Sequence, residues 1–419
     1  MEVSVEVRDE LFVERCAGLD VHKRTVTATV RFPGPKGGRA SRTKTFATTV
    51  TGLFELAEWL ASFEVSLVGM ESTGVYWKPV FYILEERFEC WLLNARHLKN
   101  VPGRKTDVAD SAWIARMIEQ GLVRPSFVPP QPIRDLRDLT RYRRALTQER
   151  SREVQRLDKV LQDAMIKLSS VVSTLQTKTA RQILAALVGG QDDPRVLAGL
   201  AQGSLKDRQD ELAEAMAGRF RREHHGLLIG QILTHVDFLD GQIAALDARL
   251  EELFAPFDDL PELVATIPGV SLRSAQVLLA ECGTDMDRFP SAAHLASWAG
   301  ICPGNDESAG KTRSGRTRKG STWLRTELTG AAKAAGRTKN TYLAAHQAQI
   351  KARRGYPKAI GATRHDILVA FFYIVRDRVP FKELGPDWHE QRNSTEHRTR
   401  RLVKQLEGLG HTVTLEPAA

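Results

Sequence analysis

The stretch Thr25-Val26-Thr27-Ala28-Thr29-Val30 alternates polar and apolar residues at every second position. Threonine and valine favour extended backbone, and a period of two sends alternate side chains to opposite faces of a sheet. The stretch therefore predicts a strand with one buried face. Residues 16–22 and 44–49 are predicted as strands on either side of it. Three short consecutive strands favour an antiparallel meander.

The chain after these strands alternates between helical and strand patterns. Residues 65–70 form a buried-strand run that ends at Glu71, and residues 89–93 form another strand. Apolar residues at helical spacing predict helices over residues 53–60, 75–87 and 108–120. The order strand, strand, strand, helix, strand, helix, strand, helix is that of the ribonuclease-H-like fold. We therefore expect residues 16–125 to form an α/β RNase H-like domain behind a charged extension at residues 1–15.

Lys105-Thr106-Asp107-Val108-Ala109-Asp110 sets two carboxylates three residues apart at the predicted start of the last of these helices. At that spacing both side chains project from the same face of the helix. The plain alternative is that acids in a first helical turn complement the helix dipole. Asp20 and Glu71, however, each stand at the end of a strand-like run. In the expected fold all four acids meet at one end of the sheet.

Four converging carboxylates would repel one another unless a cation neutralised them. Oxygen ligands without a paired histidine favour Mg²⁺ or Mn²⁺ over Zn²⁺. We therefore expect Asp20, Glu71, Asp107 and Asp110 to be catalytic acids that hold Mg²⁺ (or Mn²⁺). His22 is expected to be a surface or packing residue.

Residues 131–256 are predicted to form a helical coiled-coil region. Two apolar seams with alternating spacing of three and four support this: Val154, Leu157, Leu161, Ala164 and Leu168, and then Ile229, Ile232, Val236, Leu239, Ile243, Leu246, Leu250 and Leu253. Such seams are equally compatible with an intramolecular helical hairpin and with dimerisation. Residues 189–205, rich in Gly with an Asp-Asp-Pro turn, are predicted as a loop or insertion.

Residues 260–380 are predicted to form a mainly α-helical domain, followed by a polar tail at residues 381–419. Ile267-Pro268-Gly269-Val270 between two short helices resembles a helix-hairpin-helix motif, in which the turn at Gly269 would present N–H groups to a phosphate. An ordinary helix-turn-helix corner has a similar sequence.

Residues 311–325 contain six basic residues and no acid. The six are Lys311, Arg313, Arg316, Arg318, Lys319 and Arg325. We expect a flexible basic loop that contacts the phosphate backbone of a nucleic acid, although a solvated basic loop is the alternative. Ser308 stands just before the run, where its hydroxyl would reach a phosphorus. The alternative is an ordinary turn serine.

The 419-residue chain carries 60 Lys plus Arg and 51 Asp plus Glu, a net charge of +9. A basic excess makes nucleic acid the leading partner class. Four scattered cysteines predict reduced thiols, and no apolar run has membrane-spanning length. We expect a cytoplasmic, nucleoid-associated protein with no membrane partner.

Five segments together resemble the DEDD transposases of the insertion-sequence 110 family, relatives of the Piv DNA invertase. They are Gly18-Leu19-Asp20-Val21-His22-Lys23, Glu71-Ser72-Thr73-Gly74-Val75-Tyr76, Lys105-Thr106-Asp107-Val108-Ala109-Asp110, Ile267-Pro268-Gly269-Val270 and residues 299–325. The resemblance implies a RuvC-like N-terminal domain, a coiled coil and a C-terminal transposase domain. It also implies excision and insertion of an element through a circular intermediate.

Further expectations follow from that resemblance. Asp20, Glu71, Asp107 and Asp110 would bind the metal, and Ser308 would attack the scissile phosphate. The partners would be DNA, as element ends or circular junction and target, a second copy of the chain in a dimer or tetramer, and in some members an element-encoded guide RNA. Two alternatives stay open: a RuvC-like nuclease that cuts branched DNA with metal-activated water, and a nucleic-acid-binding protein without activity.

Overall fold

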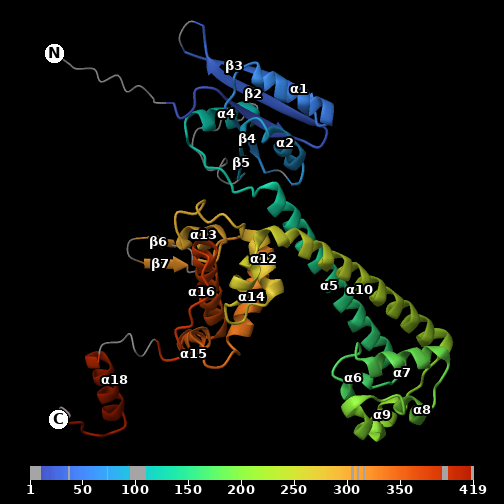
Figure 1. Cartoon of the computed structure of the whole chain (residues 1–419). Helices are drawn as coiled ribbons and strands as arrows, with labels where there is room; N and C mark the ends of the chain where they lie inside the picture. Colours follow the sequence, from blue (N-terminus) through green and yellow to red (C-terminus); the bar gives the residue numbers. More distant parts are fainter. Residues whose placement is uncertain are drawn as a thin grey trace. The chain divides into compact units, whose positions relative to one another are not determined.

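The computed structural model of the chain describes residues 11–35, 38–72, 74–94, 110–302, 306–308, 311–314, 317–388 and 395–416. The chain divides into two compact units, Met1–Pro129 and Pro130–Ala419, and each is described by itself (Figure 1). None of the helices in these ranges is both long enough and apolar enough to span a bilayer. All four cysteines are free thiols.

The first unit is built on one mixed sheet with the strand order β3-β2-β1-β4-β5. Strands β1 (Cys16–Val21), β2 (Thr25–Pro33) and β3 (Arg39–Ala47) form an antiparallel meander, as predicted. Strand β4 (Leu67–Glu71) runs parallel to β1, and β5 (Glu89–Leu93) runs parallel to β4. With helices α1 (Val50–Ala61), α2 (Trp77–Leu84) and α4 (Asp110–Glu119), the predicted order of elements is confirmed.

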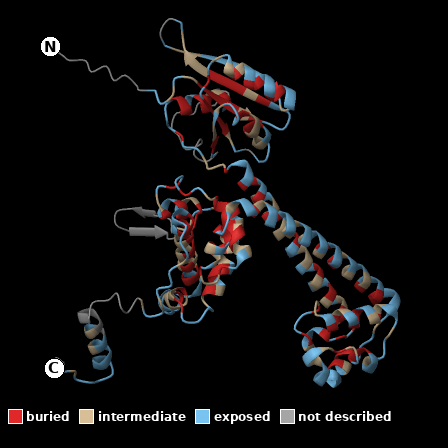
Figure 2. Ribbon diagram, in the orientation of Figure 1, coloured by how far each residue is buried: buried red, intermediate tan, exposed pale blue. Residues whose placement is uncertain are grey.

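Helices cover both faces of this sheet. Helices α1 and α2 bury their apolar sides on one face, where Leu56 and Leu84 join a core with Leu19 of β1. Helix α4 covers the opposite face, where Ile114 packs with Cys16. The alternation of residues along β1 explains this division, because neighbouring side chains point to opposite faces. The buried residues accordingly concentrate along the strands and the inner sides of the helices (Figure 2).

The second unit begins with two long helices, α5 (Gln131–Asp163) and α10 (Leu227–Phe254), which lie side by side (Figure 1). The seam residues Leu157, Val236 and Leu250 are buried, and ion pairs such as Arg143–Asp247 join the two helices. The seams therefore pack intramolecularly, which is the hairpin alternative. A dimer or tetramer of the chain stays a prediction.

A small helical cap closes one end of this hairpin. It contains α6 (Leu168–Val171), α7 (Lys178–Gly189), α8 (Pro194–Ala198), the 3₁₀ helix η1 (Gly203–Arg208) and α9 (Gln209–Met216). The prediction of a loop over residues 189–205 is therefore wrong in part. Asp193 caps α8 by accepting hydrogen bonds from the N–H groups of Arg195 and Val196, and Leu197 is buried in the core of the cap. An Asp-Pro pair is a helix-start signal as well as a turn signal.

The rest of the second unit is mainly helical. Its helices are α11 (Leu260–Ala265), α12 (Leu272–Cys282), α13 (Ala292–Trp298), α14 (Thr322–Ala335), α15 (Tyr342–Arg354) and α16 (Tyr356–Asp377), joined by a short 3₁₀ turn η3 (Ala255–Phe257) to α10. Helix α18 (Thr395–Gly408) lies within the predicted polar tail, for which no helix was predicted. Leu402 and Leu406, four residues apart, carried the helical signal that was missed.

Asp247 of α10 joins three helices and gives a testable pH dependence. Its Oδ2 accepts a hydrogen bond from Arg143 of α5 (2.9 Å), and its Oδ1 lies 2.5 Å from Nη2 of Arg273 of α12. Burial alone would raise the pKa of Asp247, but the hydrogen bond from Arg143 and the charges of both arginines outweigh it, so the pKa is lowered. A lowered pKa means that the stabilisation is fully present above about pH 4 and is lost as the pH falls through the folded-state pKa.

We therefore expect Asp247→Asn to lower the melting temperature by about 2–4 °C at pH 7, with the difference from the parent shrinking below about pH 4. The measurement is thermal unfolding between pH 3 and pH 7. Glu252→Gln, in an exposed pair with Arg249, is the matched control and should change little. A gap that stays constant down to pH 3 would contradict the assignment.

Candidate functional site

Two of the predicted acids stand on neighbouring strands of the sheet. Asp20 is the penultimate residue of β1 and Glu71 is the last residue of β4. In the parallel pairing of these strands, Gly18 lies opposite Gly69, two residues before each acid. The same register continued by two residues sets Asp20 opposite Glu71. Both side chains therefore leave the same face at the same end of the sheet, and both residues are half-buried.

Helix α4 packs unusually closely on that face. A Cβ built on Gly18 would lie 2.2 Å from the carbonyl oxygen of Ser111, and one on Gly69 would lie 2.2 Å from Cδ1 of Ile118. At Gly18, where the contacts are with the helix backbone, only glycine leaves room for α4. The pattern Gly-x-acid, present in both strands, is thus a signal for a helix that covers the site.

The direction of α4 places its start at the end of the sheet that carries the two acids. The Cys16 thiol donates to the carbonyl oxygen of Ala115, whereas Ser111, one turn earlier in α4, lies against Gly18. The helix therefore runs antiparallel to β1, and its first residue, Asp110, points toward the strand end that carries Asp20. Asp110 is exposed at that position. Asp107, the fourth predicted acid, lies outside the described residues.

His22 has a contact that the sequence analysis missed. Its Nε2 lies 3.2 Å from Oδ2 of Asp20, on a ring that is 65% exposed, and its backbone N–H closes the β1–β2 turn on Thr25. The two-residue spacing of Asp20 and His22 at a strand end was the available signal. Within the described ranges, Asp20, Glu71 and Asp110 do not draw their oxygens together within 4.8 Å.

Ser308 stands at the end of a two-stranded ribbon formed by β6 (Asp306–Ser308) and β7 (Lys311–Ser314), here called the serine ribbon. Ser308 pairs with Lys311, so two residues connect the strands. The prediction of a flexible loop is therefore wrong for residues 311–314. A two-residue connection that ends in glycine is typical of a β-hairpin, and Ala309-Gly310 carried that signal.

The segments that enter and leave the serine ribbon are held together by backbone packing and by Arg325. A Cβ on Gly320 would lie 2.0 Å from the carbonyl oxygen of Ala299, so the two backbones touch. Nη2 of Arg325 donates to the carbonyl oxygens of Gly300 (3.2 Å) and Arg318 (2.6 Å). Arg325, predicted to bind nucleic acid, thus also holds the base of the ribbon.

The other predicted nucleic-acid contacts are distributed around this ribbon. Lys311 and Arg313 belong to β7, and Arg318 and Lys319 are exposed between the ribbon and α14. Arg316 lies outside the described residues. Gly269, with φ +86°, packs on the last turn of α14, where a Cβ would lie 2.3 Å from the backbone nitrogen of Ala335. This packing already requires a glycine, so the phosphate contact of Gly269 stays a prediction.

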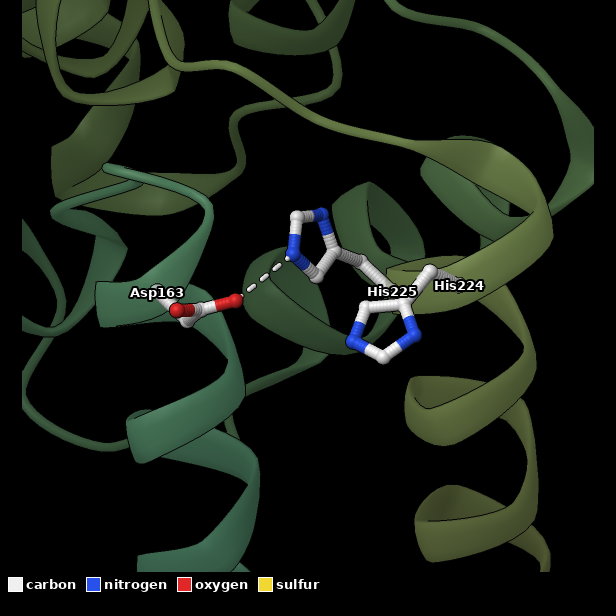
Figure 3. Close-up of side chains that lie close together, drawn as sticks. All are labelled: Asp163, His224 and His225. Carbon is white, nitrogen blue, oxygen red and sulfur yellow. Dashed lines mark hydrogen bonds and ion pairs between the residues drawn. The ribbon is translucent and has the colours of Figure 1, made fainter.

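A histidine cluster outside the predicted site lies where the end of α5 meets the π-helical turn η2 (Arg222–Gly226) (Figure 3). Asp163, His224 and His225 bring ligand atoms within 4.8 Å of one another. However, Nδ1 of His225 accepts the backbone N–H of Arg221 (3.0 Å), so its hydrogen sits on Nε2 and faces Asp163 (2.9 Å). A metal-bound histidine normally donates from its second nitrogen, which Nδ1 cannot do here. We therefore assign the buried His225 a structural role.

Fold and site together define a two-unit protein, with an acidic sheet edge in its α/β unit and a basic serine ribbon in its helical unit. Residues 17–166 match the family model of the IS110 DEDD transposases, described as "Transposase". Residues 261–347 match the model described as "Transposase IS116/IS110/IS902 family". The chain belongs to the IS110 family of transposases.

Curated relatives agree with this family. The chain is 28% identical over 218 residues to the insertion element IS900 uncharacterized 42 kDa protein of Mycobacterium paratuberculosis, covering 48% of this chain and 53% of the relative. It is 35% identical over 77 residues, 18% of each chain, to the insertion element IS110 uncharacterized 43.6 kDa protein of Streptomyces coelicolor. It is also 28% identical over 146 residues, 32% of this chain and 45% of the relative, to the pilin gene-inverting protein of Moraxella bovis. The chain thus spans about half or less of the length of these relatives.

Proposed function

We propose that this protein is a DNA transposase or site-specific recombinase of an insertion sequence, which cleaves and exchanges DNA strands. The main support is the register of β1 with β4, which when continued sets Asp20 opposite Glu71 at one end of the sheet, with the first residue of α4 directed to the same end. The names of the relatives, which refer to insertion elements and to gene inversion, support the same class of reaction.

In this proposal the first unit has an RNase H-like fold, and Asp20, Glu71 and Asp110, together with Asp107, hold a divalent cation, Mg²⁺ or Mn²⁺. The donor set fits such a cation, because it consists of carboxylate oxygens on a sheet edge that the packing of α4 holds rigid. A bound Mg²⁺ supplies positive charge that polarises a phosphate and favours phosphoryl transfer. The close packing at Gly18 serves this site by fixing where α4 begins.

Ser308 is the proposed nucleophile. Its Oγ would form a bond to the scissile phosphorus while the bond from phosphorus to the deoxyribose oxygen breaks, and that oxygen leaves with a proton. The product is a phosphoserine ester that conserves the energy of the phosphodiester for rejoining. Basic residues of the serine ribbon and of the segment before α14 would hold the neighbouring phosphates of the strand.

The test is to incubate the protein with the circular-junction DNA of its element, RNA transcribed from the flanking sequence, and Mg²⁺. We expect a covalent protein–DNA adduct on a denaturing gel, lost in Ser308→Ala and in Asp110→Ala by a factor of at least about 100. Omitting the RNA shows whether a guide is needed. Free cleaved ends that persist in Ser308→Ala but vanish in Asp110→Ala would instead support a nuclease that uses metal-activated water.

A further inference from the structure

Arg325 of α14 and Arg364 of α16 lie on two helices that pack together, next to the base of the serine ribbon. Arg325 and Thr329 lie one turn apart on α14, and Oγ1 of Thr329 donates to the carbonyl oxygen of Arg325 (2.6 Å). The same hydroxyl accepts a hydrogen bond from Nη1 of Arg364 of α16 (3.3 Å). Thr329 therefore holds the guanidinium of Arg364 one helical turn from Arg325. Sequence analysis did not single out Arg364, which is 39 positions away.

Neither guanidinium has a carboxylate partner among the side chains that the structure describes. Three other partly buried arginines of this unit do have one: Arg141 pairs with Glu281, Arg143 with Asp247, and Arg144 with Glu327. Nε of Arg364 is buried without a hydrogen-bond partner. Burial lowers the pKa of Arg364, and the charge of Arg325 lowers it further.

Two like charges held together in a half-buried position destabilise a fold unless an anion neutralises them. The geometry points to an anion of a particular kind. Guanidinium groups match phosphate oxygens with two parallel hydrogen bonds. Arg325 already binds the segments on both sides of the serine ribbon, through the carbonyl oxygens of Gly300 and Arg318. An anion held by Arg325 would therefore keep a fixed position relative to the ribbon.

We propose that Arg364 and Arg325 form a binding site for a phosphodiester of the nucleic-acid backbone at the base of the serine ribbon. The inference deepens the proposed function and rests on it, since the phosphate belongs to a strand that Ser308 attacks. Arg364 is a positioning residue in this view. It holds the strand through a phosphate other than the scissile one.

The first test measures binding without cleavage, in EDTA, so that it does not depend on the proposed chemistry. Fluorescence anisotropy of labelled junction DNA, and of single-stranded RNA of the flanking sequence, is recorded over a salt series. We expect Arg364→Gln to weaken binding by about 10-fold and to reduce the slope of log K against log salt by about 0.9. Arg249→Gln, which removes an exposed charge from α10, should leave the slope unchanged. A loss confined to RNA would overturn the proposal, because the phosphate would then not belong to the strand that Ser308 attacks. An unchanged slope with both probes would overturn it as well.

The second test separates this site from a purely structural role. In chloride, we expect Arg364→Gln to melt at the parent's temperature or a few degrees above it, because the substitution removes a like-charge contact. Sulfate at matched ionic strength should raise the melting temperature of the parent and of Arg249→Gln more than that of Arg364→Gln. Arg364→Lys, which keeps the charge without the fork, should bind with intermediate affinity. A drop of several degrees for Arg364→Gln in chloride would show that Arg364 stabilises the fold and would overturn the proposal.

Discussion

Gly18→Ala is expected to reduce the proposed metal-dependent strand cleavage by about 100-fold while most of the protein stays folded. The added methyl would lie 2.2 Å from the carbonyl oxygen of Ser111 and 2.3 Å from the backbone nitrogen of Ala115. Both atoms belong to the helix backbone, which cannot rotate away as a side chain does. Helix α4 must therefore shift, and Asp110 at its start shifts with it. A displacement of about 1 Å in an active site costs about 100-fold in rate.

Gly69→Ala is the matched comparison, since it adds the same methyl to the neighbouring strand on the same face. Its Cβ meets Cδ1 of Ile118, the far end of a flexible side chain, at 2.2 Å. Rotation of Ile118 relieves that overlap, so cleavage should fall much less than in Gly18→Ala. Both variants are expected to lose about 1–3 kcal/mol of unfolding free energy through overpacking. Cleavage rates and chemical denaturation measure the two effects separately, and equal cleavage by both variants would contradict the argument.

The sheet of the first unit was predictable because each of its strands carries a local signal. The Thr-Val alternation of β2 and the apolar run of β4 identify strands without any tertiary information. The same patterns also predicted that acids stand at strand ends, because the apolar run of β4 stops at Glu71. The register of β1 with β4, which sets Asp20 opposite Glu71, needed the structure.

The parts that sequence reasoning missed depend on contacts between distant residues or on short elements. The serine ribbon is only three and four residues long on its two strands, so neither shows a period. The Arg325–Arg364 pair exists because α14 packs on α16, which no local pattern reveals. Gly269 shows the reverse case. Its pattern indicates a phosphate-binding turn, whereas its close packing on α14 gives an independent reason for a glycine.

Glu281→Ala is expected to lower the unfolding free energy of the second unit by about 3–5 kcal/mol, because it leaves buried charge unpaired. Glu281 is 1% exposed. Its two carboxylate oxygens accept hydrogen bonds from Nε (2.6 Å) and Nη2 (2.9 Å) of Arg141 on α5, and Oε2 also accepts one from Ser321 before α14 (3.0 Å). The residue sits at the end of α12, so one side chain joins α5, α12 and the start of α14. Loss of this junction should be visible as a lower midpoint in urea unfolding.

The same junction includes Arg137, which strengthens the expectation and suggests the control. Arg137 of α5 donates to the carbonyl oxygens of Ala280 (3.1 Å) and Glu281 (2.6 Å), capping the end of α12 through backbone groups that Glu281→Ala leaves in place. The double variant Glu281→Ala with Arg141→Met removes both charges of the pair, and it should recover part of the lost stability because the Arg141 guanidinium is no longer left unpaired. Glu252→Ala, which breaks an exposed pair, should cost less than about 1 kcal/mol. If the double variant were less stable than Glu281→Ala by the full cost of a second independent change, the unpaired charge of Arg141 would not be the cause. The stabilisation would then come from the packing of the Glu281 side chain among the three helices.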